Sequence, residues 1–166
     1  MKHQIILLGK DITSVYHGIK EFGPDHVHLL CTNETKEVAA PLFPLLPDGI
    51  RRTLYRTEPY DGEHVRNVCR KIHQTYPSAE FAYNLSEGTK VMAFAAFTIA
   101  KEYSVPAFYL SQLGELIRLD SFEKYPMKSQ LDNKEILGLS GNILTEYQDA
   151  KHLSDTDVQA SGLIKQ

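Results

Sequence analysis

The sequence has only two cysteines among its 166 residues, and its charged side chains show no basic excess. Cys31 and Cys69 are too few for a disulfide scaffold and too far apart for a zinc knuckle, so we expect both to be reduced thiols in the core. The formal net charge is -3, whereas surfaces that coat duplex nucleic acid are usually strongly basic. The composition therefore argues against a duplex nucleic-acid partner and leaves room for a small anion in a local pocket.

Long apolar runs are also missing. The amino-terminal stretch MKHQIILLGK is too short for a membrane span and is followed by no small-residue cleavage site. We therefore expect no membrane partner, no export and a cytoplasmic location. A chain of 166 residues with 42% hydrophobic content is expected to form one domain of ordinary size.

The motifs of several large enzyme classes are absent. No G-x-G-x-x-G, G-x-x-x-x-G-K-[ST] or G-x-S-x-G occurs, which argues against dinucleotide binding, P-loop NTPases and acyl transfer. The seven histidines are not spaced as a ligand cluster: His26 and His28 alternate along a predicted strand, and His64 and His73 share a predicted helix. We expect such histidines to be surface residues more often than ligands, and the sequence predicts neither a metal site nor a cofactor.

A regular alternation of apolar runs and helix-like segments is what the sequence does contain. Strands are predicted at 4–9, 26–32, 51–57, 79–85 and 107–112. Helices are predicted within 10–23, after a short loop, at 33–46, within 61–77, ending before Pro77, and at 88–104. The second of these helices is expected to begin at Asn33 and to be limited by Pro44 and Pro47. Strands that alternate with helices of this length form parallel sheets with right-handed crossovers. The predicted fold class is therefore α/β, a three-layer, Rossmann-like, mostly parallel sheet.

The pattern changes after Gly114. Residues 115–119 and 122–127 predict a β-hairpin at one edge of the sheet. From residue 131 the chain is polar and helix-prone. We therefore divide it into a Rossmann-like domain at 1–130 and a polar helical segment at 131–166, which is a dimerisation arm, a linker or the start of another domain.

Small polar residues and glycines follow the predicted strands, at the edge of a parallel sheet where ligands bind. Each residue alone is explained more simply as a helix cap or part of a tight turn. Together they suit a phosphate-bearing ligand, because the glycines permit close backbone approach and two lysines add positive charge. The candidate residues are Gly9, Lys10, Asp11, Thr13, Ser14, Thr32, Asn84, Ser86, Glu87, Gly88, Thr89, Lys90, Ser111 and Gln112.

Two stretches, AYNLSEGTKVMAFAAF (82–97) and VPAFYLSQLGELIRL (105–119), resemble the CARF domain, the CRISPR-associated Rossmann fold of type III systems. The shared features are a strand that ends in Asn, a Gly-Thr-Lys turn, a Met/Ala-rich helix and a strand that leads into a hairpin. The resemblance implies a homodimer that binds a cyclic oligoadenylate, with cyclic tetra-adenylate the expected ring, in a two-fold symmetric cleft.

The resemblance also implies roles for individual residues. It assigns the ligand-binding turn to Ser86, Gly88, Thr89 and Lys90, and the hydroxyls of the first loop to Thr13 and Ser14. One position departs from the family pattern, because the second position of the turn is usually glycine and is Glu87 in this chain. A carboxylate beside phosphates would repel them unless it is turned outward.

Some CARF domains also cleave their ligand as metal-independent ring nucleases and so switch off the antiviral signal. The resemblance then implies that Lys90 stabilises charge on the reacting phosphate while Thr13 and Ser14 orient the ribose or phosphate. Two alternatives stay open: a non-cleaving sensor that controls a fused or partner effector, and an unrelated α/β enzyme that acts on a nucleotide or phosphorylated metabolite.

Overall fold

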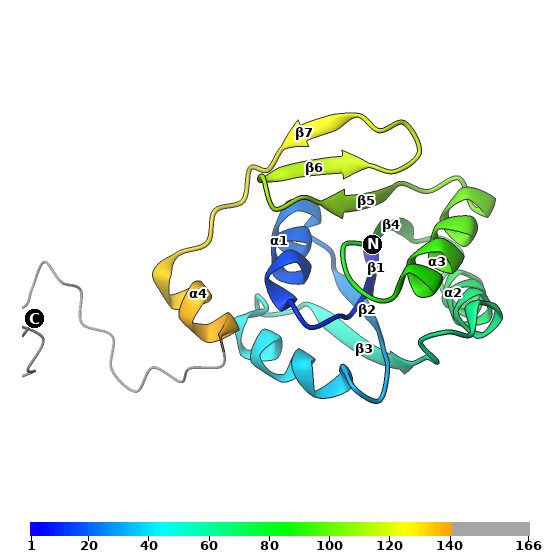
Figure 1. The fold of residues 1–166 in the computed structure, drawn as a ribbon, viewed down its shortest axis with the longest axis horizontal. Helices are drawn as coiled ribbons and strands as arrows, with labels where there is room; N and C mark the ends of the chain where they lie inside the picture. Colours follow the sequence, from blue (N-terminus) through cyan, green and yellow to red (C-terminus); the bar gives the residue numbers. More distant parts are fainter. Residues whose placement is uncertain (141–166) are drawn as a thin grey trace, which may run out of the picture.

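The computed structural model describes residues 1–140 of the chain. One sheet has seven strands in the order β3-β2-β1-β4-β5-β6-β7, parallel from β3 to β5 and antiparallel at β6 and β7 (Figure 1). The strands are β1 (Lys2–Leu7), β2 (His26–Cys31), β3 (Arg51–Arg56), β4 (Glu80–Asn84), β5 (Ala107–Leu110), β6 (Glu115–Arg118) and β7 (Lys124–Pro126). The predicted mostly parallel sheet and its edge hairpin are confirmed.

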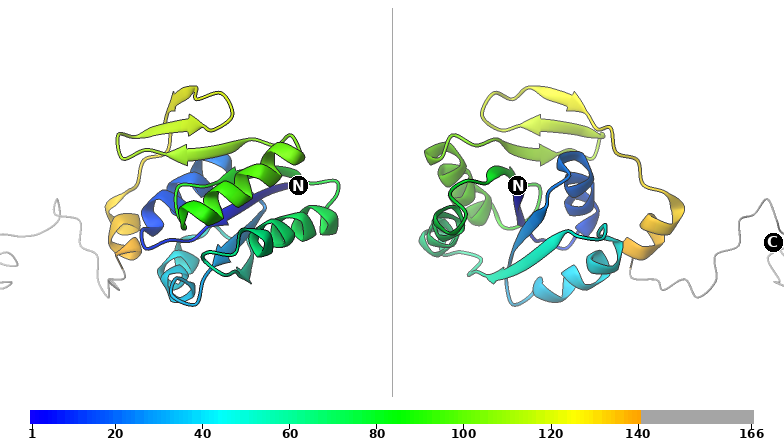
Figure 2. Two further views of the ribbon diagram at one scale, coloured as in Figure 1. Left: turned by 45° about the vertical axis from the view of Figure 1, so that its right-hand side comes forward. Right: turned by 180° about the vertical axis from the view of Figure 1, so that it is seen from behind.

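Helices cover both faces of this sheet, as the views in Figures 1 and 2 show. The helices are α1 (Ile12–Phe22), the 3-10 helix η1 (Lys36–Leu45), α2 (Gly62–Thr75), α3 (Lys90–Glu102) and α4 (Asn133–Leu139). On the central strand β1, Ile5 and Leu7 pack with α2 and α3, whereas Ile6 packs with α1 and η1. The three predicted layers are confirmed, and none of the helices within residues 1–140 is long and apolar enough to cross a bilayer.

Side-chain caps fix where α1 and α3 begin. The Asp11 carboxylate accepts a hydrogen bond from the Thr13 backbone N–H at 2.8 Å, and the Thr89 hydroxyl accepts one from the Met92 N–H at 3.1 Å. The strand order changes direction between β1 and β4, and α1 and α3 leave these strands on opposite faces. Both helix N-termini therefore lie at the carboxyl edge of the sheet, beside the point where an open α/β sheet forms a crevice.

The predicted helix at 33–46 has a different form from the one expected. It is a 3-10 helix that begins at Lys36 rather than Asn33. Pro41 and Pro44 lie inside it, and a proline has no backbone N–H to donate to the turn before it. The short 3-10 turns tolerate these two missing donors, and Leu42 is still fully buried against the sheet.

The histidines of β1 and β2 do not lie on the surface, so the sequence-based expectation for His26 and His28 was wrong. His3, His26 and His28 are 1%, 3% and 0% exposed, and His73 on α2 is 5% exposed. Alternation along a strand marks a solvent face only when one side of the sheet is open. Here both faces are covered, so alternating positions of β2 face two buried layers.

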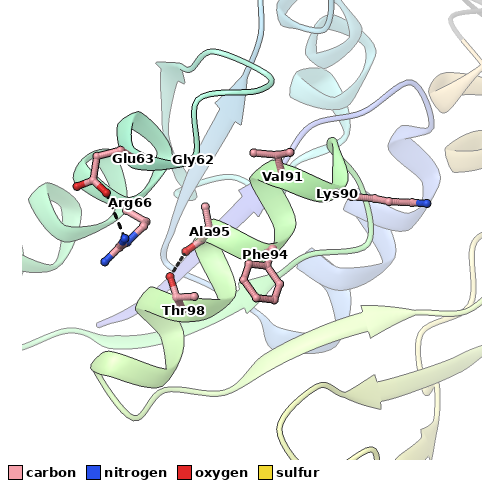
Figure 3. Close-up of a pocket in the computed structure, with 8 residues that line it drawn as sticks. All are labelled: Gly62, Glu63, Arg66, Lys90, Val91, Phe94, Ala95 and Thr98. Carbon is pink, nitrogen blue, oxygen red and sulfur yellow. Dashed lines mark hydrogen bonds and ion pairs between the residues drawn. The ribbon is translucent and has the colours of Figure 1, made fainter.

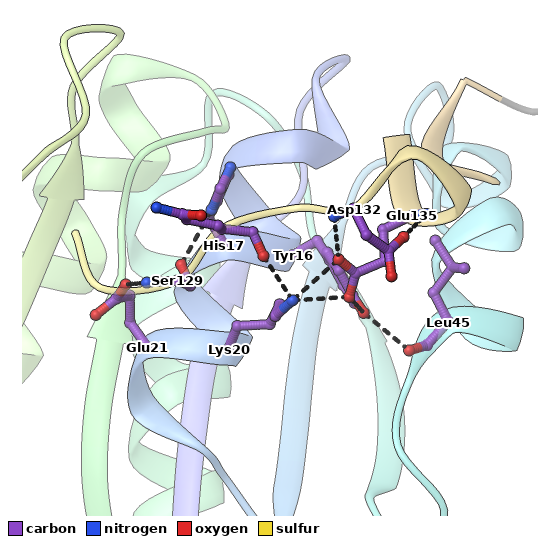
Figure 4. Close-up of polar contacts among 9 residues, drawn as sticks. Tyr16, His17, Lys20, Glu21, Leu45, Ser129, Asp132 and Glu135 are labelled. Carbon is purple, nitrogen blue, oxygen red and sulfur yellow. Dashed lines mark hydrogen bonds and ion pairs between the residues drawn. The ribbon is translucent and has the colours of Figure 1, made fainter. Parts of the chain in front are cut away.

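Polar contacts hold the segment after the hairpin against α1 (Figure 4). Glu135 of α4 accepts hydrogen bonds from Lys20 Nζ and from the Tyr16 hydroxyl, both at 2.8 Å, and Lys20 also donates to the Gln130 carbonyl. Leu139 is buried in the core shared with α1 and η1. This contact explains why a short helix can persist beyond the sheet.

The proposed boundary at residue 130 stays a prediction. Helix α4 confirms helical structure at Asn133–Leu139, at the start of the predicted polar segment. Residues 141–166, which make up most of the predicted dimerisation arm or linker, lie outside the described residues.

Candidate functional site

The loops after β1 and β4 meet at the carboxyl edge of the sheet, where the two strands end side by side. A Cβ atom at Gly9 would lie 2.0 Å from Oε2 of Glu87 and 3.0 Å from its Cβ, so a larger residue at this position would force the Glu87 side chain to move. Gly88 has φ +85°, and a Cβ there would lie 3.1 Å from Cβ of Leu7. Gly88 is therefore needed for the backbone of this turn, and Gly9 leaves the space that the Glu87 side chain occupies.

Glu87 lies inside this crevice rather than turned outward. Its Oε1 accepts a hydrogen bond from the Ser14 hydroxyl at 3.3 Å, and its side chain is half-buried over Gly9. Burial raises the pKa of the Glu87 carboxyl above its usual value, and the nearby Asp11 carboxylate raises it further. The crevice thus contains a carboxyl group that is easier to protonate than an exposed one.

Two hollows open on either side of Glu87. The first has a volume of about 250 Å³ and lies between α1, β5 and the hairpin. It brings together candidate residues from three predicted loops: Asp11, Thr13, Ser14, Ser86, Glu87, Ser111 and Gln112. The convergence expected for these loops is therefore present in the folded chain.

The second hollow has a volume of about 390 Å³ and lies on the β2 side of Glu87. Its candidate residues are Gly9, Lys10, Thr32, Glu87, Gly88 and Thr89. Because Glu87 lines both hollows, its side chain forms the partition between them. A ligand that occupies both hollows must pass this carboxyl group.

Lys90 lies apart from both hollows within one protomer. It lines a third, more open hollow of about 570 Å³ between α2 and α3, together with Val91, Phe94 and Arg66 (Figure 3). The Lys90 side chain extends away from the other labelled residues, and the Phe94 ring is 73% exposed. A single chain therefore does not assemble Lys90 with Thr13 and Ser14 in one cavity.

Several candidate side chains already have structural partners. The Asn84 amide donates to the Ser14 carbonyl at 3.2 Å, and the Ser86 hydroxyl donates to Asn84 Oδ1 at 2.6 Å and accepts from the Leu110 N–H at 2.9 Å. The Ser111 hydroxyl accepts backbone N–H groups of its own turn. These side chains tie β4 to α1 and to β5, so they shape the crevice.

Other candidates are free to bind a ligand. Within residues 1–140, no hydrogen bond or ion pair engages the side chains of Lys10, Thr13, Lys90 and Gln112. Lys10 and Thr13 lie beside the N-terminus of α1, where backbone N–H groups favour an anion. In the crevice itself, the groups available to a ligand are glycine backbone, the side chains of Lys10, Thr13 and Gln112, and the N-termini of two helices.

Two aromatic residues at the rims of the hollows were not predicted from the sequence. Tyr60 lines the second hollow and is 80% exposed, and Tyr109 lines the first hollow and is half exposed. Exposed aromatic rings are surfaces on which nucleobases stack. Their exposure was the only available signal, and exposure is not visible in a sequence.

No family profile and no curated protein sequence matches the chain. Among solved structures, Can2 from Sulfobacillus thermosulfidooxidans in complex with cyclic tetra-adenylate matches with a TM-score of 0.75 and 22% identity, over 85% of this chain and 41% of Can2. Protein VC1899 from Vibrio cholerae has a TM-score of 0.73 and 13% identity, over 84% of this chain and 39% of that protein. A type III CRISPR defence DNA nuclease activated by cyclic oligoadenylate has a TM-score of 0.71 and 22% identity, over 95% of this chain and 26% of the nuclease.

These matches establish the fold. The Rossmann-like, mostly parallel α/β architecture predicted from the sequence is confirmed by structures that share it over most of this chain. This chain spans about two fifths or less of the length of those proteins.

Proposed function

We propose that this chain binds a cyclic oligoadenylate, in particular cyclic tetra-adenylate, as a homodimer and cleaves it as a metal-independent ring nuclease that ends type III CRISPR antiviral signalling. The observation that carries the proposal is the crevice between the ends of β1 and β4, where two glycines, two helix N-termini and unpaired Lys10 and Thr13 come together. The fold shared with Can2 in complex with cyclic tetra-adenylate supports the choice of ligand.

The crevice suits the chemistry of such a ring. Its phosphates are anions, and the N-termini of α1 and α3 offer backbone N–H groups and positive partial charge. Its adenines need flat surfaces, which Tyr60 and Tyr109 offer at the two rims. Both requirements are met on the same edge of the sheet.

The exposed face of α3 supports a homodimer. Val91 and Phe94 are 39% and 73% exposed and lie three residues apart on one face of the helix, and exposed apolar side chains that adjoin one another suit a contact surface. Lys90 begins the same helix, four residues before Phe94. A dimer formed through this face would bring two copies of Lys90 to its two-fold axis, next to a ligand that spans both protomers.

Cleavage needs positioning and charge rather than a metal. The ribose 2'-oxygen bonds to the adjacent phosphorus while the bond from phosphorus to the 5'-oxygen breaks. The 2'-hydroxyl loses its proton and the 5'-oxygen gains one, so the products carry a 2',3'-cyclic phosphate and a 5'-hydroxyl. In this proposal Thr13 and Ser14 align the ribose, and Lys90 stabilises the negative charge that develops on the phosphate.

Glu87 is expected to weaken binding of the ring. Changing Glu87→Gln removes the carboxylate and keeps a side chain of the same size, so binding should tighten about five- to tenfold at neutral pH because one repulsive charge is lost. Wild-type affinity should rise as the pH falls through the raised pKa of Glu87, since protonation also removes the charge. The glutamine variant should lack this part of the pH dependence.

Titration calorimetry with cyclic tetra-adenylate at several pH values measures both effects. Glu37→Gln is the matched control, because Glu37 is exposed on η1 and lines neither hollow beside Glu87. Weaker binding by the Glu87→Gln variant would show instead that the carboxylate contacts the ligand favourably.

The proposed function is tested by incubating the protein with cyclic oligoadenylates of different ring sizes in EDTA and separating the products by chromatography. We expect one ring bound per two chains and linear products that end in a 2',3'-cyclic phosphate. Rings that bind and stay intact would identify a sensor that controls a fused or partner effector. No binding to any ring would refute the proposal and favour an enzyme that acts on another nucleotide or phosphorylated metabolite.

A further inference from the structure

Three histidines occupy neighbouring core positions at the amino ends of β1 and β2. His3 pairs with His26 across the two strands, and His28 follows His26 on the same face. Farther along the same face, Ile5, Leu7 and Leu30 hold the apolar positions that pack against α2 and α3. Imidazole rings thus replace apolar side chains at three adjoining core sites.

The rings approach one another closely. Nδ1 of His3 lies 2.9 Å from Nε2 of His28, the rings of His26 and His28 stack with centroids 4.1 Å apart, and one nitrogen from each histidine lies within 4.8 Å of the others. Two nitrogens bound to one zinc-like ion lie at most about 4.2 Å apart, because each metal–nitrogen bond is about 2.1 Å long. Rotation of the rings, which includes unstacking His26 from His28, would bring all three nitrogens into ligand positions.

In two of the histidines, the ring nitrogen that would face away from a metal ion has a hydrogen-bond partner, as is usual for metal ligands. Nε2 of His26 lies 2.9 Å from the Thr53 hydroxyl, and Nδ1 of His28 lies 3.2 Å from the Tyr55 hydroxyl. Such partners on the far ring nitrogen fix the orientation of a coordinating imidazole. The remaining nitrogen of His26, Nδ1, is buried and has no hydrogen-bond partner in residues 1–140. A buried nitrogen without a partner is costly unless something binds it.

We propose that His3, His26 and His28 form a binding site for a transition-metal ion of the zinc class, enclosed between the sheet and the end of α2. Imidazole is the usual ligand of such ions, and the ion would replace the proton between His3 and His28. Within the part of the chain that the structure describes, this is the one group of three metal-ligating side chains, and no carboxylate or thiolate joins it.

The surroundings set the chemistry of this site. The facing charges are Arg51, the chain's amino terminus and Asp25, of which the first two oppose a cation and the third favours one. Tyr76 covers all three rings, with centroids 4.6 to 5.5 Å away.

This site lies at the amino ends of the strands, opposite to the crevice that holds the proposed ligand. Its ion would join β1 to β2 and stabilise the fold, and it would take no part in ring cleavage. The proposal therefore stands independently of the proposed function.

The test uses protein unfolded with a chelator and then refolded with or without Zn²⁺. We expect about one zinc per chain by elemental analysis and a higher melting temperature with zinc. Co²⁺ in place of Zn²⁺ should give visible absorption bands typical of imidazole ligands in a low-symmetry site. Wild-type protein that refolds without taking up either ion would overturn the proposal.

Variants locate the ion. His28→Gln should abolish stoichiometric uptake, whereas His64→Gln, which removes a histidine outside the group, should retain it. Thr53→Val keeps the shape of a half-buried strand residue and should lower metal affinity about 10- to 100-fold, so it tests the site even if a histidine variant fails to fold. Equal zinc binding by wild-type, His28→Gln and Thr53→Val proteins would also overturn the proposal.

Discussion

Changing Lys90→Ala is expected to slow cleavage of a cyclic oligoadenylate by about 100- to 1,000-fold while weakening its binding far less. A cation that stabilises charge on the phosphate acts mainly in the transition state, and loss of one such group usually has an effect of this size on kcat. Single-turnover cleavage rates and ring dissociation constants, measured on the same preparations, separate the two effects.

Two further variants control this experiment. Lys90→Arg keeps the positive charge and should recover part of the rate, whereas Lys101→Ala removes an exposed lysine from the last turn of the same helix and should leave the rate unchanged. Equal losses of cleavage and binding in Lys90→Ala would reduce Lys90 to a binding residue.

The same prediction depends on the assembly of two chains. Within one protomer, Lys90 lines the hollow between α2 and α3, whereas Thr13 and Ser14 line a different hollow. Cleavage should therefore require the homodimer, and the rate per chain should fall when the protein is diluted below its dimer dissociation constant. A rate per chain that stays constant as the dimer dissociates would place the reaction inside one protomer and exclude the proposed position of Lys90.

Acidification is expected to destabilise the fold strongly between pH 6.5 and pH 4. Burial lowers the pKa of His26 and His73 to about 4 and that of His28 to about 3. In the unfolded chain these histidines take up protons below about pH 6.5, but in the folded chain they stay neutral until the pH is much lower. The contribution of these histidines to the free energy of unfolding is therefore fully present above their pKa in the unfolded chain. It is lost as the pH falls toward their pKa in the folded chain.

The expected loss is large. A histidine that stays neutral only in the folded chain contributes up to about 1.4 kcal/mol per pH unit in this window, so even one of them accounts for a sizeable part of the stability of an ordinary domain. Urea unfolding at several pH values, with a chelator present to keep metal from the histidines, measures this loss.

His73→Gln provides the matched comparison. His73 lies outside the group of three histidines, and its Nε2 lies 3.0 Å from the Tyr83 hydroxyl, a contact that a glutamine amide can replace. The free energy of unfolding should fall less steeply with pH in the variant than in the wild type. The difference in slope should correspond to about one proton fewer taken up on unfolding. A slope equal to that of the wild type would show that His73 does not titrate between the two states as we expect.

The local pattern of the sequence determined the elements and the fold class. Apolar runs alternate with helix-like segments, and each pattern reflects a local conformational preference. Except at η1, the folded chain adopts the conformation that this preference predicts. The same information indicated the hairpin after Gly114 and the glycines at the ends of β1 and β4, because turns and close backbone approaches demand particular residues. Local pattern was less reliable at η1, where Pro41 and Pro44 favoured a 3-10 helix over the expected α-helix.

Only the tertiary structure decided what surrounds each side chain. Glu87 lies over Gly9 and divides the crevice because two loops from distant parts of the chain meet there. His3, His26 and His28 form one buried group because β1 and β2 pair in a particular register and α2 covers that face. Burial and the distance between charges depend on residues far apart in sequence, and these set the pKa of Glu87 and the coordinating capacity of the histidines.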